Sequence, residues 1–128
     1  MTQQFDDTVE QLLENILKEN YSVLTRPPSK IVVIPNSDAD KILAKNRPGR
    51  FDPADALRMA IRDWDTYKTQ RIYEKDTYQG YTRRKGVRSD VILKLRGRTT
   101  PRALGFIEND TFYVNWVGTH EEANKIIN

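Results

Sequence analysis

Cysteine is absent from the chain, and histidine occurs once among its 128 residues. The lack of cysteine excludes disulfides, thiolate metal sites and a cysteine nucleophile. One histidine is too few for a zinc site built on histidines, so we expect neither a metal site nor a cofactor. The longest apolar run, from Ile31 to Pro35, is far too short to span a membrane, and the acidic start lacks the pattern of a signal peptide. We therefore expect a soluble, cytoplasmic protein.

The signatures of several enzyme classes are missing as well. The sequence has no glycine-rich phosphate loop, no G-x-S-x-G nucleophile elbow and no dinucleotide fingerprint. Asp63 and Asp65 lie two residues apart in a predicted helix, where they face different sides, so they do not form the carboxylate pair of a two-metal nuclease. Any catalysis would therefore depend on Lys, Arg, Tyr and His side chains.

What the sequence does contain indicates one α+β domain over residues 1–128. Hydrophobic residues make up 38% and charged residues 30%, a balance typical of a globular protein with one modest core. Residues 1–67 are predicted to be mainly helical with one short strand, and residues 90–128 to form a strand, a hairpin and a short C-terminal helix. We expect a small antiparallel sheet of about four strands, with the N-terminal helices packed on one face.

Local signals place the elements of the N-terminal half. Ser37 has capping character before an amphipathic stretch, and Asp52 followed by Pro53 is a strong helix start, with Asp at the N-cap and proline in the first helical position. Apolar residues at helical spacing, including Trp64 as a core residue, supply the buried faces. We predict helices over 5–19, 38–45 and 53–67 and a short strand over 30–35.

The C-terminal third alternates between apolar and polar residues, as strands do. Residues 90–96 have this pattern and predict a half-buried strand, and Asn109-Asp110 suits the positive φ angles of a type I′ hairpin turn. The turn sets a register whose pairs form the core face: Ile107 with Phe112, Gly105 with Val114, and Ala103 with Trp116. In this register the other face, which we expect to be open, carries Arg102, Leu104, Phe106, Thr111, Tyr113, Asn115 and Val117.

Charge is distributed unevenly along the chain. Residues 83–102 carry eight Lys and Arg against one Asp, whereas residues 1–40 carry three basic and seven acidic residues. Each close pair of exposed like charges costs up to roughly 1 kcal/mol in water. An anionic partner relieves that repulsion, and nucleic acid is the common one. The alternative is a solvated basic surface that pairs in part with the acidic N-terminal helix.

The basic strand and the open hairpin face together predict a surface for RNA. Metal-independent cleavage needs a base for the 2′-OH, an acid for the leaving oxygen, and cations for the charge that grows on phosphorus. Arg suits the last role, and Lys, His and Tyr can transfer protons. The predicted catalytic residues are Lys94, Arg96, Arg102, Tyr113 and His120. The predicted nucleic-acid-binding residues are Arg83, Arg84, Lys85, Arg88, Arg98 and Asn115.

The last strand runs Phe112-Tyr-Val-Asn-Trp-Val-Gly-Thr-His120 and continues as Glu-Glu-Ala-Asn-Lys-Ile126. This stretch resembles the C-terminal signature of HigB-type toxins of the RelE superfamily, in which a final strand leads into Gly-Thr-His and a short charged tail. The resemblance implies a RelE-like fold, endoribonuclease activity on free or ribosome-bound mRNA, and a cognate antitoxin as partner. The basic positions that match are Lys94, Arg96, Arg102 and His120.

Two other functions remain open on this sequence. A non-catalytic nucleic-acid-binding module, including a phage-encoded one, would bind through the same basic face without cleavage. A protein inhibitor would dock that face on an acidic partner. Lys94 and Arg96 also fit charges that protect an edge strand, and His120 also fits a helix cap. Under the nuclease hypothesis, Arg96→Ala or Arg102→Ala removes activity while the fold survives.

Overall fold

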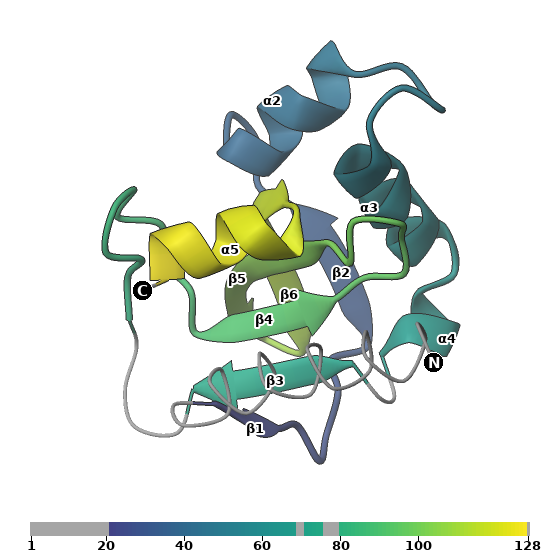
Figure 1. The fold of residues 1–128 in the computed structure, drawn as a ribbon. Coiled ribbons are helices and arrows are strands. Elements are labelled where there is room, and N and C mark those ends of the chain that lie inside the picture. The colour runs from purple at the N-terminus through teal and green to yellow at the C-terminus, as the bar shows by residue number, and fades with distance from the viewer. Residues whose placement is uncertain (1–20, 69–70, 76–79, 128) are drawn as a thin grey trace, which may run out of the picture.

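The structure is a computed structural model that describes residues 21–68, 71–75 and 80–127. A six-stranded sheet forms its centre, in the order β1-β3-β4-β5-β6-β2 (Figure 1). The strands are β1 (Tyr21–Val23), β2 (Lys30–Val33), β3 (Ile72–Lys75), β4 (Val91–Lys94), β5 (Arg102–Glu108) and β6 (Thr111–Gly118). The helices are α2 (Asp38–Lys45), α3 (Asp52–Arg62), α4 (Trp64–Tyr67) and α5 (His120–Ile127). The predicted α+β class is confirmed, and the predicted helix over 5–19 lies outside the described residues.

The sheet differs from the predicted four-stranded antiparallel one in size and in type. β3 pairs with β1 on one side and with β4 on the other, so a polar stretch adds a strand that the sequence did not indicate. β2 forms the opposite edge and runs parallel to β6, with Ile31 opposite Phe112 and Val33 opposite Val114. These two strands are far apart in the sequence, and no local signal predicts that they pair.

The larger core lies between the sheet and the helices α2, α3 and α4. Ala60 and Leu57 of α3 are fully buried in it, and burial of a leucine side chain contributes about 1.5–3 kcal/mol. The Trp64 ring of α4 lies against Phe112, with ring centroids 6.2 Å apart, and its Nε1 donates a hydrogen bond to the Pro28 carbonyl over 3.0 Å. These three helices therefore pack on one face, as the sequence predicts.

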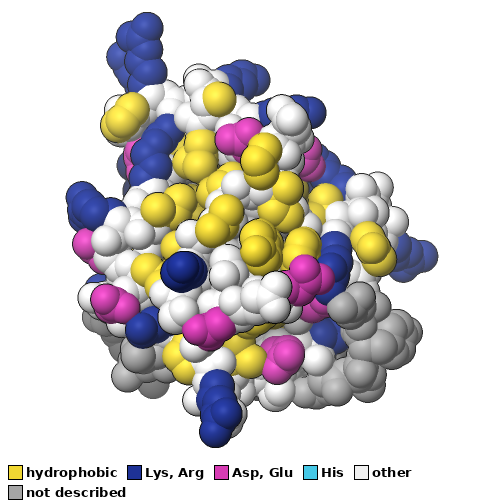
Figure 2. Space-filling view, turned by 180° about the vertical axis from the view of Figure 1, so that it is seen from behind, with side chains coloured by type: hydrophobic (Ala, Val, Ile, Leu, Met, Phe, Trp, Pro, Cys, Tyr) yellow, Lys and Arg dark blue, Asp and Glu magenta, His cyan; other side chains and the backbone are white. Residues whose placement is uncertain are grey.

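The opposite face is not open, which corrects the prediction. α5 lies across it, in front of β5 in Figure 1. Ile92, Leu104 and Trp116 form a second core there with Ala123 and Ile126 of α5. On the side of the molecule seen in Figure 2, hydrophobic side chains gather in the middle, and Lys and Arg side chains are scattered around them without forming one patch. The basic residues therefore do not share one bare sheet face.

The hairpin turn is confirmed, but the predicted register fails beyond Gly105. Asn109 and Asp110 have φ angles of 49° and 60°, as a type I′ turn requires. A bulge then shifts the ladder between β5 and β6, so that Ala103 lies opposite Val117 instead of the predicted Trp116.

The bulge decides which residues of β6 enter which core. Asn115 is the extra residue, and its Nδ2 donates to the Arg88 carbonyl over 2.8 Å instead of facing a strand partner. One extra residue turns every following side chain to the other face. Trp116 therefore packs under α5, and Val117 joins the larger core, the reverse of the prediction.

Two helix predictions have different outcomes. The helix over 38–45 is confirmed with these bounds, and Ser37 caps it by accepting a hydrogen bond from Asp40 N over 3.2 Å. The predicted helix over 53–67 is divided at Asp63, where the backbone leaves helical geometry (φ −112°, ψ 40°). Its start also differs, because Phe51 and not Asp52 occupies the N-cap position. In the described part of the chain, no helix is long and apolar enough to cross a membrane.

Candidate functional site

A hollow of about 510 Å³ lies where the loop after β4 meets the start of α5. Its lining consists of Arg98, Thr99, Thr100, Thr119, His120, Glu121 and Asn124. We call it the threonine cleft. Two of the predicted site residues, Arg98 and His120, therefore come together although 22 positions separate them in the sequence. The cleft combines hydroxyl groups, one exposed cation, one imidazole and one exposed carboxylate.

Asp52 fixes the loop that forms one wall of the threonine cleft. Its carboxylate accepts hydrogen bonds from Arg98 N (3.2 Å), Thr99 N (2.8 Å) and Thr99 Oγ1 (2.6 Å). Gly97 permits this approach, because a Cβ there would lie 2.8 Å from the carboxylate. Burial by itself raises the pKa of Asp52, but the bonds from Thr99 and Arg98 and the Arg98 charge outweigh it, so the pKa lies below its ordinary value.

The lowered pKa of Asp52 predicts a pH-dependent contribution to stability. The contribution is complete above the unfolded pKa, about 3.9, and is lost as the pH falls through the lower folded pKa. At pH 7 we expect Asp52→Ala to reduce the free energy of unfolding by about 1–3 kcal/mol. Urea unfolding at pH 7 and near pH 3 measures this, and the difference between parent and variant should shrink in acid. An equal difference at both pH values would contradict the assignment.

Thr100 lies in this loop with a strained backbone. Its φ is 45°, in the left-handed region that a β-branched residue rarely adopts. Such a conformation costs on the order of 1–3 kcal/mol and persists only where neighbouring contacts hold it. Here the Thr100 carbonyl accepts a bond from Arg102 Nη1 over 2.8 Å, and Thr100 Oγ1 lies 3.3 Å from His120 Nδ1. Strain of this kind is more common at functional sites than elsewhere.

The start of α5 forms the opposite wall. Thr119 and Glu122 make a capping box, in which Thr119 Oγ1 accepts from Glu122 N over 3.1 Å and Glu122 Oε1 accepts from Thr119 N over 2.9 Å. Thr119 is therefore the capping residue, and His120 is the first residue of the helix. His120 is only 6% exposed, and its backbone N–H donates to the Thr99 carbonyl over 3.3 Å. The positive end of the helix dipole faces the cleft.

Arg102 lies beneath the cleft and not in it. It is 1% exposed, and its Nη1 donates to the carbonyls of Thr100 (2.8 Å) and Pro101 (3.2 Å). Lys94 lies opposite Arg102 in the ladder and is half-buried. Arg102 of β5 and His120 of α5 therefore both contact Thr100, and Arg98 lines the same cleft from the loop. In this arrangement Arg102 supports the wall of the cleft.

The predicted catalytic residues Arg96 and Tyr113 lie away from the cleft. Arg96 is exposed after the end of β4, with its guanidinium 5.8 Å from the Tyr67 ring in the layer of α4. Tyr113 belongs to the hairpin end of β6 and stacks on Phe106, with ring centroids 5.4 Å apart. Neither lines the threonine cleft. The catalytic roles assigned to them from the sequence remain predictions without geometric support.

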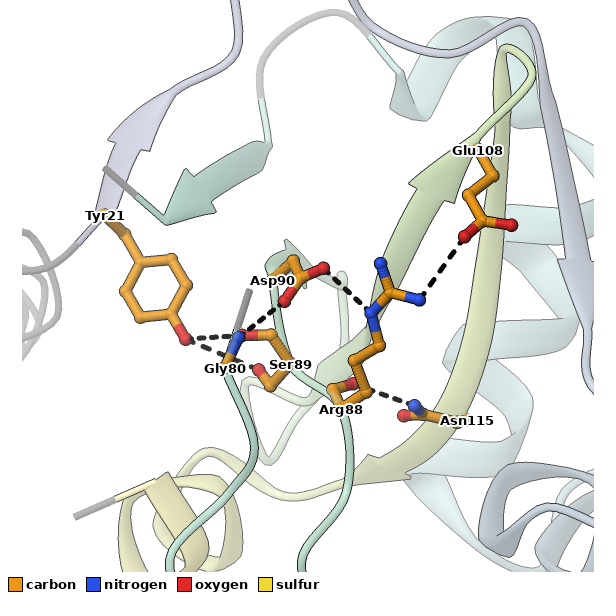
Figure 3. A network of polar contacts seen from close by, with 7 residues as sticks. All are labelled: Tyr21, Gly80, Arg88, Ser89, Asp90, Glu108 and Asn115. Carbon is orange, nitrogen blue, oxygen red and sulfur yellow. Dashed lines mark hydrogen bonds and ion pairs between the residues drawn. The ribbon is translucent and has the colours of Figure 1, made fainter. Parts of the chain in front are cut away.

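Arg88, a predicted RNA-binding residue, is part of a polar network near the hairpin (Figure 3). Its guanidinium pairs with Asp90 over 3.0 Å and with Glu108 over 3.4 Å. The same network extends to β1, where the Tyr21 hydroxyl donates to the Ser89 carbonyl over 2.9 Å. Two carboxylates compensate the Arg88 charge, so this arginine is better suited to joining the strands than to attracting phosphate.

The turn that contains Arg83, Arg84 and Lys85 is exposed and lies beside the C-terminal end of α5. Arg83 N donates to the Ile126 carbonyl over 2.9 Å, and Lys85 Nζ lies 4.0 Å from Asp38. Arg84 and Lys85 line a different hollow from the threonine cleft. The eleven basic, aromatic and amide residues predicted from sequence therefore divide among several places.

Sequence reasoning missed several residues of the threonine cleft. Thr99 and Thr100 follow Arg98 directly, and a pair of hydroxyls between two arginines is a signal that could have been used. The sequence around Asp52 and Glu121 gives no such signal. Asp52 fixes the loop and Glu121 lines the cleft only because folding brings distant segments together. The described residues include no group of three His, Asp or Glu side chains that could hold a metal ion.

Comparison with known protein families, with curated proteins and with solved structures gives no match to this chain.

Proposed function

We propose that the protein binds RNA at the threonine cleft and cleaves it there without a metal ion. The observation that carries the proposal is the cleft itself, in which Arg98 and His120 lie beside Thr100 and the contacts of Arg102 and His120 hold the strained Thr100 backbone in place. The positive end of α5 and the cleft's hydroxyl groups can donate hydrogen bonds to a phosphate. Arg98 is exposed and can form a bidentate contact with it.

The cleft also holds two groups that can transfer protons. Glu121 is exposed and can take the proton from a ribose 2′-OH, whose oxygen then attacks phosphorus. His120, when protonated, can give a proton to the departing 5′-oxygen. The bond from phosphorus to that oxygen breaks, which leaves a 2′,3′-cyclic phosphate and a 5′-hydroxyl. Arg98 and the end of α5 stabilise the charge on the phosphate oxygens.

RNA binding without cleavage is the second candidate, and the burial of His120 favours it. An imidazole that is 6% exposed and lies beside Thr100 is well placed to hold the loop, and less well placed to reach a substrate. A toxin of the RelE/HigB type with an antitoxin partner stays a prediction, which rests on the residues of the last strand.

Binding and cleavage are tested separately with single variants. Arg98→Ala is expected to weaken RNA binding about tenfold. The slope of the logarithm of the binding constant against the logarithm of the salt concentration should become smaller by about one. His120→Gln is expected to reduce cleavage by about 10²-fold or more with binding retained. Fluorescence anisotropy and gel analysis of labelled single-stranded RNA, without divalent ions, measure the two effects.

Arg96→Ala is the matched control, because Arg96 is also an exposed arginine of this segment but does not line the cleft. It should bind and cleave as the parent does. If Arg98→Ala and Arg96→Ala behave alike, the threonine cleft is not the binding site. If the parent binds RNA and does not cleave it, the second candidate replaces the first.

A further inference from the structure

A second hollow, of about 450 Å³, lies on the other side of α5. Phe51, Trp116 and Ile126 give it an apolar floor, and Arg84, Lys85 and Lys125 stand among its lining residues. We call it the Trp116 cleft. α5 separates it from the threonine cleft, because His120, Glu121 and Asn124 line one and Glu122, Lys125 and Ile126 line the other.

The charges around the Trp116 cleft favour an anion. Arg84 and Lys125 are exposed, and neither forms an ion pair with any residue that the structure describes. Lys85 has one distant pair, with Asp38 at 4.0 Å. The single acidic residue of the lining, Glu122, is engaged in the capping box of α5. Three cations therefore face one carboxylate that already has a partner.

The backbone of the basic turn is held in place before any ligand binds. Arg83 N donates to the Ile126 carbonyl over 2.9 Å, which ties the turn to the end of α5. Thr82 N donates to the Val87 carbonyl over 2.7 Å and closes the turn, and Gly86 supplies its positive φ of 63°. A preorganised turn loses little backbone entropy when its side chains bind a ligand.

The floor depends on a close approach between Trp116 and Gly118. A Cβ at Gly118 would lie 2.5 Å from Trp116 Cη2, so the indole lies across a position where no side chain fits. Trp116 is only 3% exposed, so it lies at the bottom of the cleft and a small part of its ring faces the hollow, beside Phe51 and Ile126. A planar apolar group is the natural complement of such a floor.

We propose that the Trp116 cleft is a nucleotide subsite. The base lies on the apolar floor, and the phosphate binds Arg84, Lys85 and Lys125. This inference deepens the proposed function and rests on it for the source of the nucleotide, because one RNA strand that crosses α5 would enter both clefts. The ligand chemistry is a nucleoside phosphate, either a unit of RNA or a free nucleotide.

Tryptophan fluorescence can test the subsite directly. The chain has two tryptophans, and Trp64 lies in the other core, so Trp64→Phe leaves Trp116 as the only reporter. Titration of this variant with AMP is expected to change its fluorescence in a saturable way. Adenosine and ribose 5-phosphate should each bind at least about tenfold more weakly than AMP, because adenosine lacks the phosphate and ribose 5-phosphate lacks the base. The fluorescence of the Trp116→Phe variant, which keeps Trp64, should not change when AMP is added.

The basic residues are tested in the Trp64→Phe background. Arg84→Ala/Lys125→Ala is expected to weaken AMP binding by about tenfold or more. The matched control is Lys45→Ala/Arg47→Ala, which removes one exposed lysine and one exposed arginine outside the cleft. No saturable change with AMP, or ribose 5-phosphate binding as tightly as AMP, would overturn the subsite.

RNA titrations separate this inference from the proposed function. If AMP binds and single-stranded RNA neither binds nor displaces it, the subsite is a free-nucleotide site and RNA binding is wrong. If RNA binds the parent but Arg84→Ala/Lys125→Ala binds it equally well and AMP gives no signal, the subsite is wrong and the threonine cleft stands. If RNA displaces AMP, the subsite accepts a unit of RNA, and the Arg98→Ala and Arg96→Ala variants decide whether the same RNA also occupies the threonine cleft.

Discussion

Arg102→Ala is expected to unfold the protein or to lower its free energy of unfolding by about 3 kcal/mol or more. Arg102 is 1% exposed and is among the largest fully buried side chains. Its removal leaves a cavity beside β4 and deprives the carbonyls of Thr100 and Pro101 of their donor. The loop that carries Thr100 in its left-handed conformation would then lose one of its supports. Urea unfolding followed by circular dichroism measures the loss.

Arg96→Ala is the control for this experiment as well. Arg96 is exposed, and its guanidinium lies 5.8 Å from the centre of the Tyr67 ring, so its loss should cost less than about 1 kcal/mol. A folded Arg102→Ala variant with parental stability would show that the burial of Arg102 contributes nothing. This prediction also replaces the sequence-based one, since loss of activity in an unfolded variant would not identify a catalytic residue.

Gly105→Ala is expected to disrupt the hairpin of β5 and β6 and to cost about 3 kcal/mol or more, or to prevent folding. A Cβ at Gly105 would lie 1.8 Å from the Tyr113 carbonyl oxygen and 2.8 Å from the Phe112 ring. The first contact is with backbone, which cannot move without breaking the ladder next to the bulge. Expression in the soluble fraction and thermal unfolding report the effect.

Gly80→Ala is the matched substitution. Gly80 is buried as well, but a Cβ there would meet only the far end of the Lys75 side chain, which can rotate away. It should therefore cost much less than Gly105→Ala. If the two variants are equally stable, β5 and β6 do not approach as closely as this structure shows.

Local physics made several elements predictable from the sequence. The Asn109-Asp110 turn, the helix capped by Ser37 and the strand predicted over 30–35 depend on neighbours in the chain, and all three occur, although the strand is shorter and ends at Val33. The strand over 90–96 is shorter than predicted and ends at Lys94. The same reasoning could not find β3, because its polar residues gain their strand conformation from pairing with β1 and β4.

The candidate site was predictable only in its residue types. The density of arginine and lysine after residue 82 and the Gly-Thr-His end of β6 indicated Arg98, Arg102 and His120; Arg98 and His120 line one cleft, and Arg102 supports its wall. Which of these side chains would be buried and which would face solvent was not predictable. Whether an arginine points to solvent or into a core depends on which helix covers its face.

By itself, the sequence determined that the chain is an α+β protein without cysteine chemistry, that its last strands form a tight hairpin, and that its positive charge gathers in one segment. Tertiary structure alone decided that α5 covers the second face, that Arg102 is buried and that two clefts flank α5. For the core that α5 covers, the physical reason lies in the bulge at Asn115. One extra residue turned Trp116 toward α5, and such a shift depends on contacts between strands that no local pattern contains.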